Sequence, residues 1–395
     1  MFMGVKAVFT DRRFAGHIGT QNCPKYKAQG QQLPGSKRAR LAIFQAFCIL
    51  FAMSVVCDLE SFSPAARGGV LCIGNFDGVH RGHARMLACG RTLATQCGRP
   101  FVMMTFAIHP LSILTPKTAP PSLMTLNQRL ELLQSFSPDT IILLQPDPQF
   151  LAMAAETFLH EVVVSTIGAK HMVEGPSFTF GCGAAGDVAM LEKQHAAYGF
   201  DFTVVPTVAT TLADLTEVTV SSSLCRWLIT HGRVQDAAQL LGRPYTLRSV
   251  VIHGQGRGKK MGYPTVNLAV QQLLPAQGVY AGRALVAGCW YPAAISVGTN
   301  STFGQHQVSV EAFLLDFSGD IYEASIDLAF DQWIRDQQSF AGMEPLQRRI
   351  TLDVQTVRHV HEKFKPIRAI SDVNHMPPGQ AVPAPAAILC QGQQS

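Results

Sequence analysis

The most informative segment of the sequence is "GVLCIGNFDGVHRGHARMLACG", Gly69 to Gly90. The apolar run from Val70 to Ile73 ends at a glycine-rich loop that carries His80 and His83. The apolar spacing after His83 is typical of a helix, so the stretch predicts a buried strand, a loop and a helix. Such a loop places both histidines at the start of a helix, where free N–H groups can bind a phosphate group.

The alternation of strand and helix continues to about residue 240. The apolar runs predict buried strands, and the segments between them have helical spacing. The expected strands are "VLCIG", "FVMMTF", "TIILLQ", "HMVEG" and "FTVVP", and the expected helices include "LNQRLELLQSF", "AETFLHEVVV" and "DVAMLEKQHAAYG". This order predicts a parallel sheet with covering helices, on which phosphate-bearing ligands bind at the carboxyl ends of the strands.

The pattern changes between Tyr245 and about Gln332. Five β-rich runs, "LRSVVIHG", "GVYAGRALV", "AAISVGT", "VSVEAFLLDF" and "YEASIDLAF", follow one another with Gly, Asn and Ser turns and no helix between them. They predict an antiparallel barrel or a sandwich. The segment 343–364 has helical spacing, and the Pro/Ala/Gln-rich tail after it has the composition of a disordered segment.

Composition limits the classes of function. The chain of 395 residues is long enough for two domains, and its net charge is +5. Residues 1–52 hold eight Lys/Arg against one aspartate, which leaves a net charge of −2 for the rest and no basic surface for nucleic acid. The ten cysteines form no C-x-x-C pair, so we expect buried, reduced thiols of a cytoplasmic protein.

The N-terminal segment has its own pattern. Leu41 to Cys57 is a run of 17 uncharged residues behind "KRAR", which is the lower limit for a membrane span. The leader is too long for an ordinary signal peptide, and residues 1–40 are basic like a transit peptide but contain one serine only. We favour the hypothesis that translation starts at Met53, which would remove the apolar run and leave "MSVVCDLESF" as a short first strand. We expect no membrane association for the body of the chain.

The histidine loop suits one kind of chemistry. Two imidazoles three positions apart, together with Gly74 and Gly78, suit the transfer of an α-phosphate to an oxygen that is already anionic. Such an attack needs no general base, only neutralisation of charge on the phosphates. A single histidine would more often be a polar loop residue or a metal ligand, but the combination favours a nucleotide site.

Here the sequence resembles a family. "IGNFDGVHRGH" is similar to the nucleotidyltransferase signature of bacterial bifunctional riboflavin kinase/FMN adenylyltransferases, the FAD synthetases, and the resemblance extends from about Met53 to Phe364. A second signature element matches Ser221, Ser222, Ser223 and Arg226, where hydroxyls would cap a helix and the arginine would hold a phosphate. The resemblance implies His80, His83 and Arg226 as catalytic residues, and it implies the ATP contacts Gly74, Phe76, Asp77, Gly78, Ser222 and Ser223.

The β-rich half carries the other signature. The glycines of "HGQGRGKKMGYPTVNL" fit neither G-x-G-x-x-G nor a Walker A loop. The residues after them resemble the P-T-A-N motif of the family, with Val266 in place of alanine. The resemblance implies Thr265 and Asn267 as ligands of Mg²⁺ and of ATP phosphates. It implies Glu311 as the base that takes a proton from a ribityl hydroxyl. It also implies Arg335 as a flavin contact, and this assignment is weaker because Gln337 stands nearby where the family has glutamate. It also implies the ATP contacts Gly254, Gly258, Gly262 and Pro264.

The resemblance implies a two-domain, Mg²⁺-dependent enzyme that uses ATP. A Rossmann-like domain, expected at 53–240, would make FAD from FMN, and a barrel closed by a helix, expected at 241–365, would make FMN from riboflavin. Residues 1–52 would be an extension and 366–395 a tail. We expect a cytoplasmic monomer or weak homo-oligomer that binds riboflavin, FMN and ATP but no nucleic acid.

Several positions depart from the family pattern in the first half. Ser177 stands where the family has Asp or Asn, "TFAIHP" lacks an acidic residue before His109, and Cys225 replaces a β-branched residue. A kinase with an impaired transferase, or with a first domain that only binds nucleotide or flavin, therefore remains an alternative. The histidine motif and Arg226 favour catalysis, and Ser177 favours the binding domain.

Overall fold

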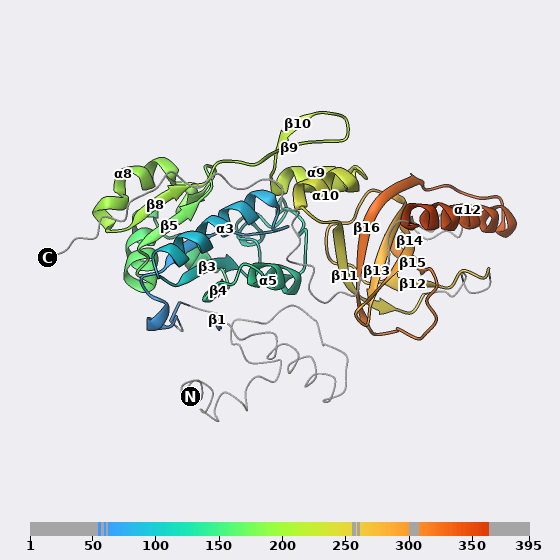
Figure 1. Cartoon of the computed structure of the whole chain (residues 1–395), viewed down its shortest axis with the longest axis horizontal. Helices are drawn as coiled ribbons and strands as arrows, with labels where there is room; N and C mark the ends of the chain where they lie inside the picture. The colour runs from blue at the N-terminus through green and yellow to red at the C-terminus, as the bar shows by residue number, and fades with distance from the viewer. Residues whose placement is uncertain are drawn as a thin grey trace, which may run out of the picture. The chain divides into compact units, whose positions relative to one another are not determined.

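A parallel sheet with covering helices forms the first part of the structure (Figure 1). The computed structural model describes residues 54–56, 59–60, 62–254, 258, 261–299 and 308–362. The described residues from Val56 onward belong to one compact unit. The N-terminal apolar run, Met53 and the tail after residue 362 lie outside the described residues, apart from a short strand β1 (Ser54–Val56).

The central strands of the sheet, β2 and β3, are apolar and mostly buried. All four residues of β2 and of β5 are buried, as is expected when helices cover both faces. The strands from β2 onward have the order β4-β3-β2-β5-β8, and each of these pairs is parallel. They are β2 (Val70–Ile73), β3 (Phe101–Phe106), β4 (Thr140–Leu144), β5 (His171–Glu174) and β8 (Asp201–Val204).

Helices connect successive parallel strands, as the sequence predicted. The main helices are α3 (Arg81–Gln96), α5 (Leu126–Gln134), α7 (Ala155–Thr157), the π-helix η2 (Phe158–Ile167), α8 (Val188–Tyr198), α9 (Ser222–Thr230) and α10 (Val234–Leu241). Shorter elements are η1 (Pro64–Ala66), α4 (Leu111–Leu114), α6 (Pro148–Leu151), β6 (Thr179–Phe180), η3 (Cys182–Ala184), β7 (Gly186–Asp187), β9 (Ala209–Thr211) and β10 (Glu217–Thr219).

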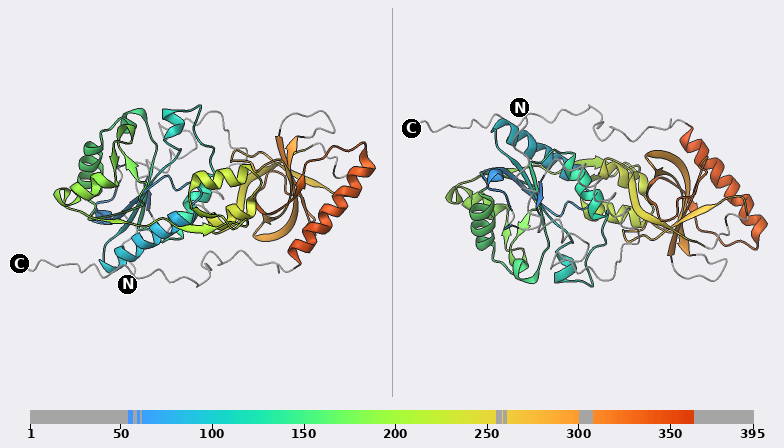
Figure 2. Two further views of the ribbon diagram at one scale, coloured as in Figure 1. Left: turned by 90° about the horizontal axis from the view of Figure 1, so that it is seen from above. Right: turned by 90° about the horizontal axis from the view of Figure 1, so that it is seen from below.

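The β-rich half is a closed barrel, which decides between the barrel and the sandwich (Figure 2). Its strand order is β11-β12-β15-β14-β13-β16, and neighbouring strands are antiparallel. The strands are β11 (Tyr245–Ile252), β12 (Thr265–Leu268), β13 (Gly278–Val286), β14 (Cys289–Thr299), β15 (Val308–Leu314) and β16 (Ser325–Asp336). Buried and exposed residues alternate along β11, so one face of each strand fills the barrel.

The helix α12 (Met343–His361) packs on the outside of this barrel. Val354 and Val357 of the helix contact Ala281 and Leu315 in a small apolar cluster. The predicted barrel closed by a helix is confirmed.

The α/β part and the barrel share one hydrophobic core. Leu228 and Leu240 from α9 and α10 belong to the same buried cluster as Leu247 and Phe330 of the barrel. The segment before α5 also meets the barrel, because Leu273 N donates to Ser122 O at 2.9 Å. The histidine loop and the β-rich half are therefore carried by parts that pack against each other.

One expectation about local structure is confirmed with a different helix type, and another is wrong. The expected helix "AETFLHEVVV" is present but is mostly a π-helix, in which Gly168 N closes the end by bonding Val163 O five residues back. The thiols of Cys182 and Cys289 are exposed, although buried thiols were expected. Cys182 lies in a short turn after β6 and Cys289 begins a hairpin strand, and such loop-edge positions are open to solvent.

Candidate active sites

The histidine loop lies at the carboxyl end of β2, where the sequence predicted a phosphate site. Phe76, Gly78 and Val79 have φ angles of 48°, 86° and 36°, so the loop turns sharply before the helix. The Phe76 ring is fully buried and packs edge-on against His83, so in the structure this side chain anchors the loop. The turn ends at His80, which is the N-cap of α3.

His80 and His83 stack on each other at the helix start. Their ring centroids lie 3.7 Å apart with an interplanar angle of 13°, and His80 Nδ1 accepts from His83 N at 3.2 Å. Burial lowers the pKa of His80 to about 4 and the pKa of His83 well below its usual value. Both rings are neutral near pH 7, and the bond at His80 Nδ1 leaves the proton of that ring on Nε2. His83 Nδ1 is buried without a hydrogen-bond partner, so it can bond to a ligand.

Arg226 reaches this loop from α9. Its Nη2 lies 2.5 Å from Asp77 Oδ2, and its Nε donates to Pro121 O at 2.8 Å. Both Asp77 carboxylate oxygens also accept from Leu123 N at 3.0 Å. Asp77 therefore orients Arg226 in this structure, and both of its carboxylate oxygens are occupied.

The serines at the start of α9 differ in their hydrogen bonds and in their exposure. Ser221 caps the helix by accepting from Leu224 N at 3.2 Å. Ser222 Oγ donates to Asp77 O at 2.8 Å, which ties the helix to the histidine loop. Ser223 is exposed at the same helix start. The structure thus brings the two sequence signatures, about 140 residues apart, into contact.

Two arginines at this loop were missed by the sequence reading. Arg129 of α5 donates to Asn75 O at 2.8 Å and to Phe106 O at 2.5 Å. Arg243, which follows α10, donates to Gly78 O at 2.6 Å. Both bond to backbone carbonyls, and no sequence spacing marks such contacts.

Polar groups at the edge of the loop complete this region. Asn75 Nδ2 lies 3.3 Å from His109 Nε2, and Asn75 Oδ1 is buried without a partner. Ser177 is exposed in the loop after β5. The role of Ser177 stays a prediction.

The second region lies on the outer face of the barrel. Asn267 of β12 is paired directly with Glu311 of β15, and Glu311 is paired with Ser296 of β14. Thr265 Oγ1 donates to Glu311 Oε2 at 3.3 Å. Directly opposed residues of neighbouring strands share a face, so these polar side chains form one row. Ala312 and Val310, on either side of Glu311, fill the barrel interior.

Glycines bring the preceding loop close to this row. A Cβ on Gly254 would lie 2.1 Å from Asn267 Nδ2, and one on Gly258 would lie 2.2 Å from Tyr263 O. A larger residue at Gly258 would displace the backbone, and one at Gly254 would displace the Asn267 side chain. Gly262 (φ 83°) and Pro264 lie in the turn that leads into β12, and residues 255–257, 259 and 260 lie outside the described part.

The row offers ligands of the type that Mg²⁺ prefers. Thr265, Asn267 and Glu311 supply hydroxyl, amide and carboxylate oxygens side by side. Mg²⁺ is usually held by one or two carboxylates and by substrate phosphates, so this set fits the ion. Among the described residues there is no group of three or more His, Cys, Asp and Glu suited to a metal ion.

Arg335 lies at the end of β16 and bonds to α12. Its Nη2 lies 2.7 Å from Asp353 Oδ2, and its Nε lies 3.0 Å from Oδ1 of the same carboxylate. The guanidinium therefore fastens the helix to the barrel, and its flavin contact stays a prediction. Gln337 Nε2 donates to Ser296 Oγ at 2.9 Å and to Val297 O at 3.1 Å. A glutamate could not donate these bonds, so the glutamine at position 337 ties the end of β16 to β14 in a way that a glutamate could not.

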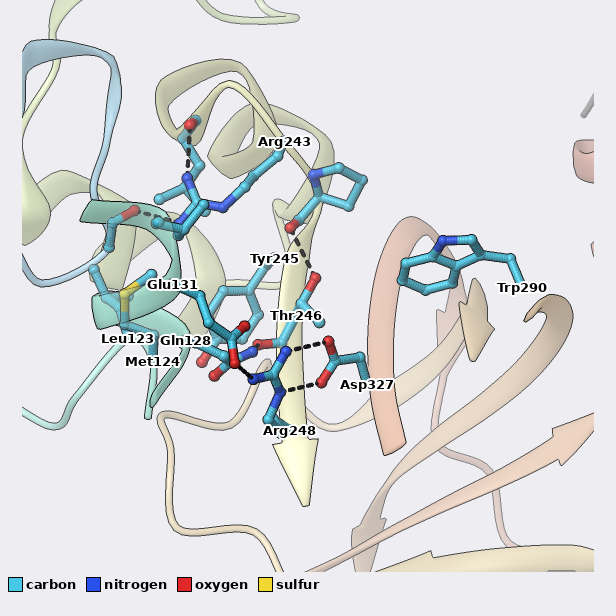
Figure 3. Close-up of a pocket in the computed structure, with 14 residues that line it drawn as sticks. Leu123, Met124, Gln128, Glu131, Arg243, Tyr245, Thr246, Arg248, Trp290 and Asp327 are labelled. Atoms are coloured by element: carbon cyan, nitrogen blue, oxygen red, sulfur yellow. Dashed lines mark hydrogen bonds and ion pairs between the residues drawn. The ribbon is translucent and has the colours of Figure 1, made fainter. Parts of the chain in front are cut away.

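A cavity of about 300 Å³ lies away from the polar row, between α5, the start of β11 and the barrel (Figure 3). Arg248 crosses it and bonds to Glu131 Oε1 at 2.6 Å and to Asp327 Oδ1 at 2.6 Å. Gly78 and Arg243 form another part of its wall. The cavity therefore reaches the back of the histidine loop.

Comparison with known proteins identifies the chain. A family model described as riboflavin kinase matches residues 241–361, and one described as FAD synthetase matches residues 63–223. A bifunctional riboflavin kinase/FMN adenylyltransferase of Pseudomonas fluorescens is 33% identical over 308 residues, which cover 78% of this chain and 97% of the relative. The chain belongs to the bifunctional riboflavin kinase/FMN adenylyltransferase family. It is an enzyme with a kinase domain and an adenylyltransferase domain.

A second named relative agrees with this membership, and one solved structure is similar to the chain over most of its length. The bifunctional riboflavin kinase/FMN adenylyltransferase of Escherichia coli (strain K12) is 32% identical over 317 residues, which cover 80% of this chain and 100% of the relative. A crystal structure titled as a macrolide-efflux protein from Streptococcus pneumoniae has a TM-score of 0.67 and 27% identity, and the match covers 78% of this chain and 98% of that one. The resemblance that the two signatures carried is confirmed. In the described part of the chain, every helix is too short or too polar to cross a membrane.

Proposed function

We propose that the histidine loop transfers the adenylyl group of ATP to the phosphate of FMN, and that the polar row on the barrel phosphorylates riboflavin. The observation that carries this assignment is the distribution of carboxylates. Glu311 lies in the barrel row beside Thr265, whereas the one carboxylate in the histidine loop, Asp77, is held by Arg226 and Leu123 N. An alcohol needs a base to become a nucleophile, and a phosphate does not.

At the histidine loop, a phosphate oxygen of FMN attacks the α-phosphorus of ATP. The bond from that phosphorus to the bridging oxygen breaks, and diphosphate leaves. His80 and His83 donate hydrogen bonds from neutral rings, and free N–H groups at the start of α3 contribute positive potential. Arg226 neutralises charge on the phosphates, and Asp77 holds its guanidinium in place. The ATP contacts proposed for this centre come from the histidine loop and the start of α9: Gly74, Phe76, Asp77, Gly78, Ser222 and Ser223.

At the barrel row, Glu311 accepts the proton of the terminal ribityl hydroxyl of riboflavin. The hydroxyl oxygen attacks the γ-phosphorus of ATP, and ADP leaves. Thr265 and Asn267 would hold the phosphates and Mg²⁺, and a bound Mg²⁺ would neutralise charge on the transferred phosphoryl group. Arg335 contacts the flavin side, and the loop that binds ATP is shaped by Gly254, Gly258, Gly262 and Pro264.

We also propose a cytoplasmic location, a monomer or weak homo-oligomer, and the domain limits 53–240 and 241–365.

The test follows FMN and FAD by chromatography after riboflavin, ATP and Mg²⁺ are added to the purified protein. We expect FMN first and FAD later. Glu311→Gln should abolish FMN formation but still convert supplied FMN to FAD, and Arg226→Ala should do the reverse. FMN that accumulates without FAD, even when FMN is supplied directly, would contradict the transferase assignment and leave a kinase with a binding domain.

A further inference from the structure

Arg243 lies in the part of the sequence that matches the riboflavin kinase model, the kinase segment, but its side chain contacts the histidine loop. It lies between α10 and β11, inside the residues 241–361 that the riboflavin kinase model matches. Its Nη2 donates to Gly78 O at 2.6 Å, and its Nη1 donates to Val79 O at 3.1 Å. These two carbonyls immediately precede His80, and Figure 3 shows the guanidinium directed away from the barrel strands.

The loop that Arg243 holds has an unfavourable backbone. Val79 is β-branched and has a φ of 36°, which a β-branched residue rarely adopts. Such a conformation persists only where neighbouring groups hold it. Two donors from one planar guanidinium fix two successive carbonyls, and they thereby fix the direction in which the chain enters α3. Leu241 O accepts a third bond, at 3.1 Å, which fastens the same side chain to the end of α10.

The charge of Arg243 also reaches the two histidines. The guanidinium is buried, and burial lowers its pKa to about 10, so it is charged at neutral pH. Within the described ranges, no carboxylate forms an ion pair with it, unlike Arg226 and Arg248. The charge acts on both rings and contributes to their lowered pKa values. A largely buried cation that bonds to carbonyls but has no carboxylate to balance its charge is costly, and a bound polyphosphate would compensate the charge.

We propose that Arg243 is a positioning residue for adenylyl transfer, by which the kinase segment completes the transferase site. The inference rests on the proposed function of the histidine loop. It predicts that the loop is disordered or misplaced, with the transferase slow, when this guanidinium is removed. The alternative is that Arg243 only joins α10 to the barrel, in which case its loss would lower stability without a specific effect on transfer.

Chemical rescue separates these two roles. Arg243→Ala should lower kcat for FAD formation by about 10²-fold, the cost of a small misplacement, and change KM for ATP less. Kinase turnover in the same sample should stay within twofold and reports that the protein is folded. Because Gly78 and Arg243 line the cavity in Figure 3, added guanidinium ion at concentrations well below those that unfold proteins can enter the vacated position and should restore FAD formation.

The matched control is Arg248→Ala. Arg248 lines the same cavity and loses the same group, but it bonds to Glu131 and Asp327 instead of the loop. This variant should keep the transferase kcat and show no response to guanidinium. If Arg243→Ala does not fold, Arg243→Lys keeps the charge with a single ammonium, and its transferase kcat should fall about tenfold because one of the two carbonyl bonds is lost.

The outcomes are distinct. A wild-type transferase kcat in Arg243→Ala or in Arg243→Lys would overturn the proposal. A loss that guanidinium does not reverse, with kinase turnover reduced in parallel, would also overturn it and assign Arg243 to the connection alone. If the unaltered protein makes no FAD from supplied FMN, the proposed function fails before the role of Arg243 is in question.

Discussion

Asp77 and Arg226 are 149 positions apart in the chain, and their side chains meet at 2.5 Å. The pair is buried, with 9% of the Asp77 side chain and 13% of the Arg226 side chain exposed. It joins the loop after β2 to the start of α9, and these two segments carry the two family signatures. The contact makes the position of Arg226, the arginine proposed for catalysis, dependent on the Asp77 carboxylate.

Asp77→Asn should therefore affect both stability and transfer. The amide still accepts from Leu123 N, but Arg226 keeps its charge without a partner. The free energy of unfolding should fall by about 3 kcal/mol, as for removal of one partner of a buried pair, and FAD formation should slow. Urea unfolding at pH 7 measures the first effect. Glu344→Gln, which removes an exposed pair with Arg348, is the control and should cost less than about 0.5 kcal/mol; equal losses in the two variants would contradict the buried pair.

The histidine stack should make stability depend on pH. The folded pKa of His80 is lowered to about 4 from the usual 6.5, so the unfolded chain binds the proton more tightly. The stabilisation is complete above pH 6.5 and decreases as the pH falls toward 4, by about 1.4 kcal/mol per pH unit for each such histidine. His80→Asn keeps an acceptor at the N-cap but does not titrate. The unfolding free energy of His80→Asn should fall less between pH 7 and pH 5 than that of the unaltered protein. The same decrease in both proteins would show that His80 is not buried in its neutral form.

Gly258→Ala should impair only the kinase. Its Cβ would lie 2.2 Å from Tyr263 O and 3.2 Å from Thr265 Oγ1, so the backbone must move away from the polar row. FMN formation should fall by about 10²-fold, while FAD formation from supplied FMN stays unchanged. Gly342→Ala in the same half meets no atom within 4 Å and is the matched control. Equal kinase rates in the two variants would exclude a role for the close approach.

Ser177→Asn tests the departure in the transferase half. Ser177 is exposed and shorter than the residue the family has, so one bond to substrate is expected to be missing. A hydrogen bond contributes about 0.5–1.5 kcal/mol, so the asparagine should raise the rate of FAD formation about 2–10-fold. Ser177→Ala should leave that rate almost unchanged. A large loss in the alanine variant would show that the serine hydroxyl is itself essential.

The sequence predicted the local features well because local features depend on local patterns. The strand, loop and helix around His80, the parallel sheet and the β-rich half all follow from apolar spacing and glycines. Periodicity could not decide between a barrel and a sandwich, because closure depends on the pairing of β11 with β16. The π-helix in Phe158–Ile167 was also missed, since its pattern is the same as that of a buried α-helix.

The candidate sites were predictable only in part. Signatures identified residues of the kind that bind phosphate, and the structure brings His80, Asp77 and Arg226 together. It could not be predicted that Asp77 bonds to Arg226, or that Arg243 bonds to the carbonyl of Gly78 165 residues earlier. Every residue type carries a backbone carbonyl, so a contact to a carbonyl does not depend on the residue type that accepts it. The side chains that donate to such carbonyls therefore form no sequence motif.

The shared hydrophobic core has a consequence for how such chains can be recombined. A crossover between two relatives at residue 241, where one family match begins, would separate Leu240 from Phe330 although they lie in one core. A crossover before α9 would keep Leu240 with Phe330 but separate Arg226 from Asp77. Neither junction exchanges a self-sufficient half, so functional hybrids of this family should need compensating changes on both sides of the junction.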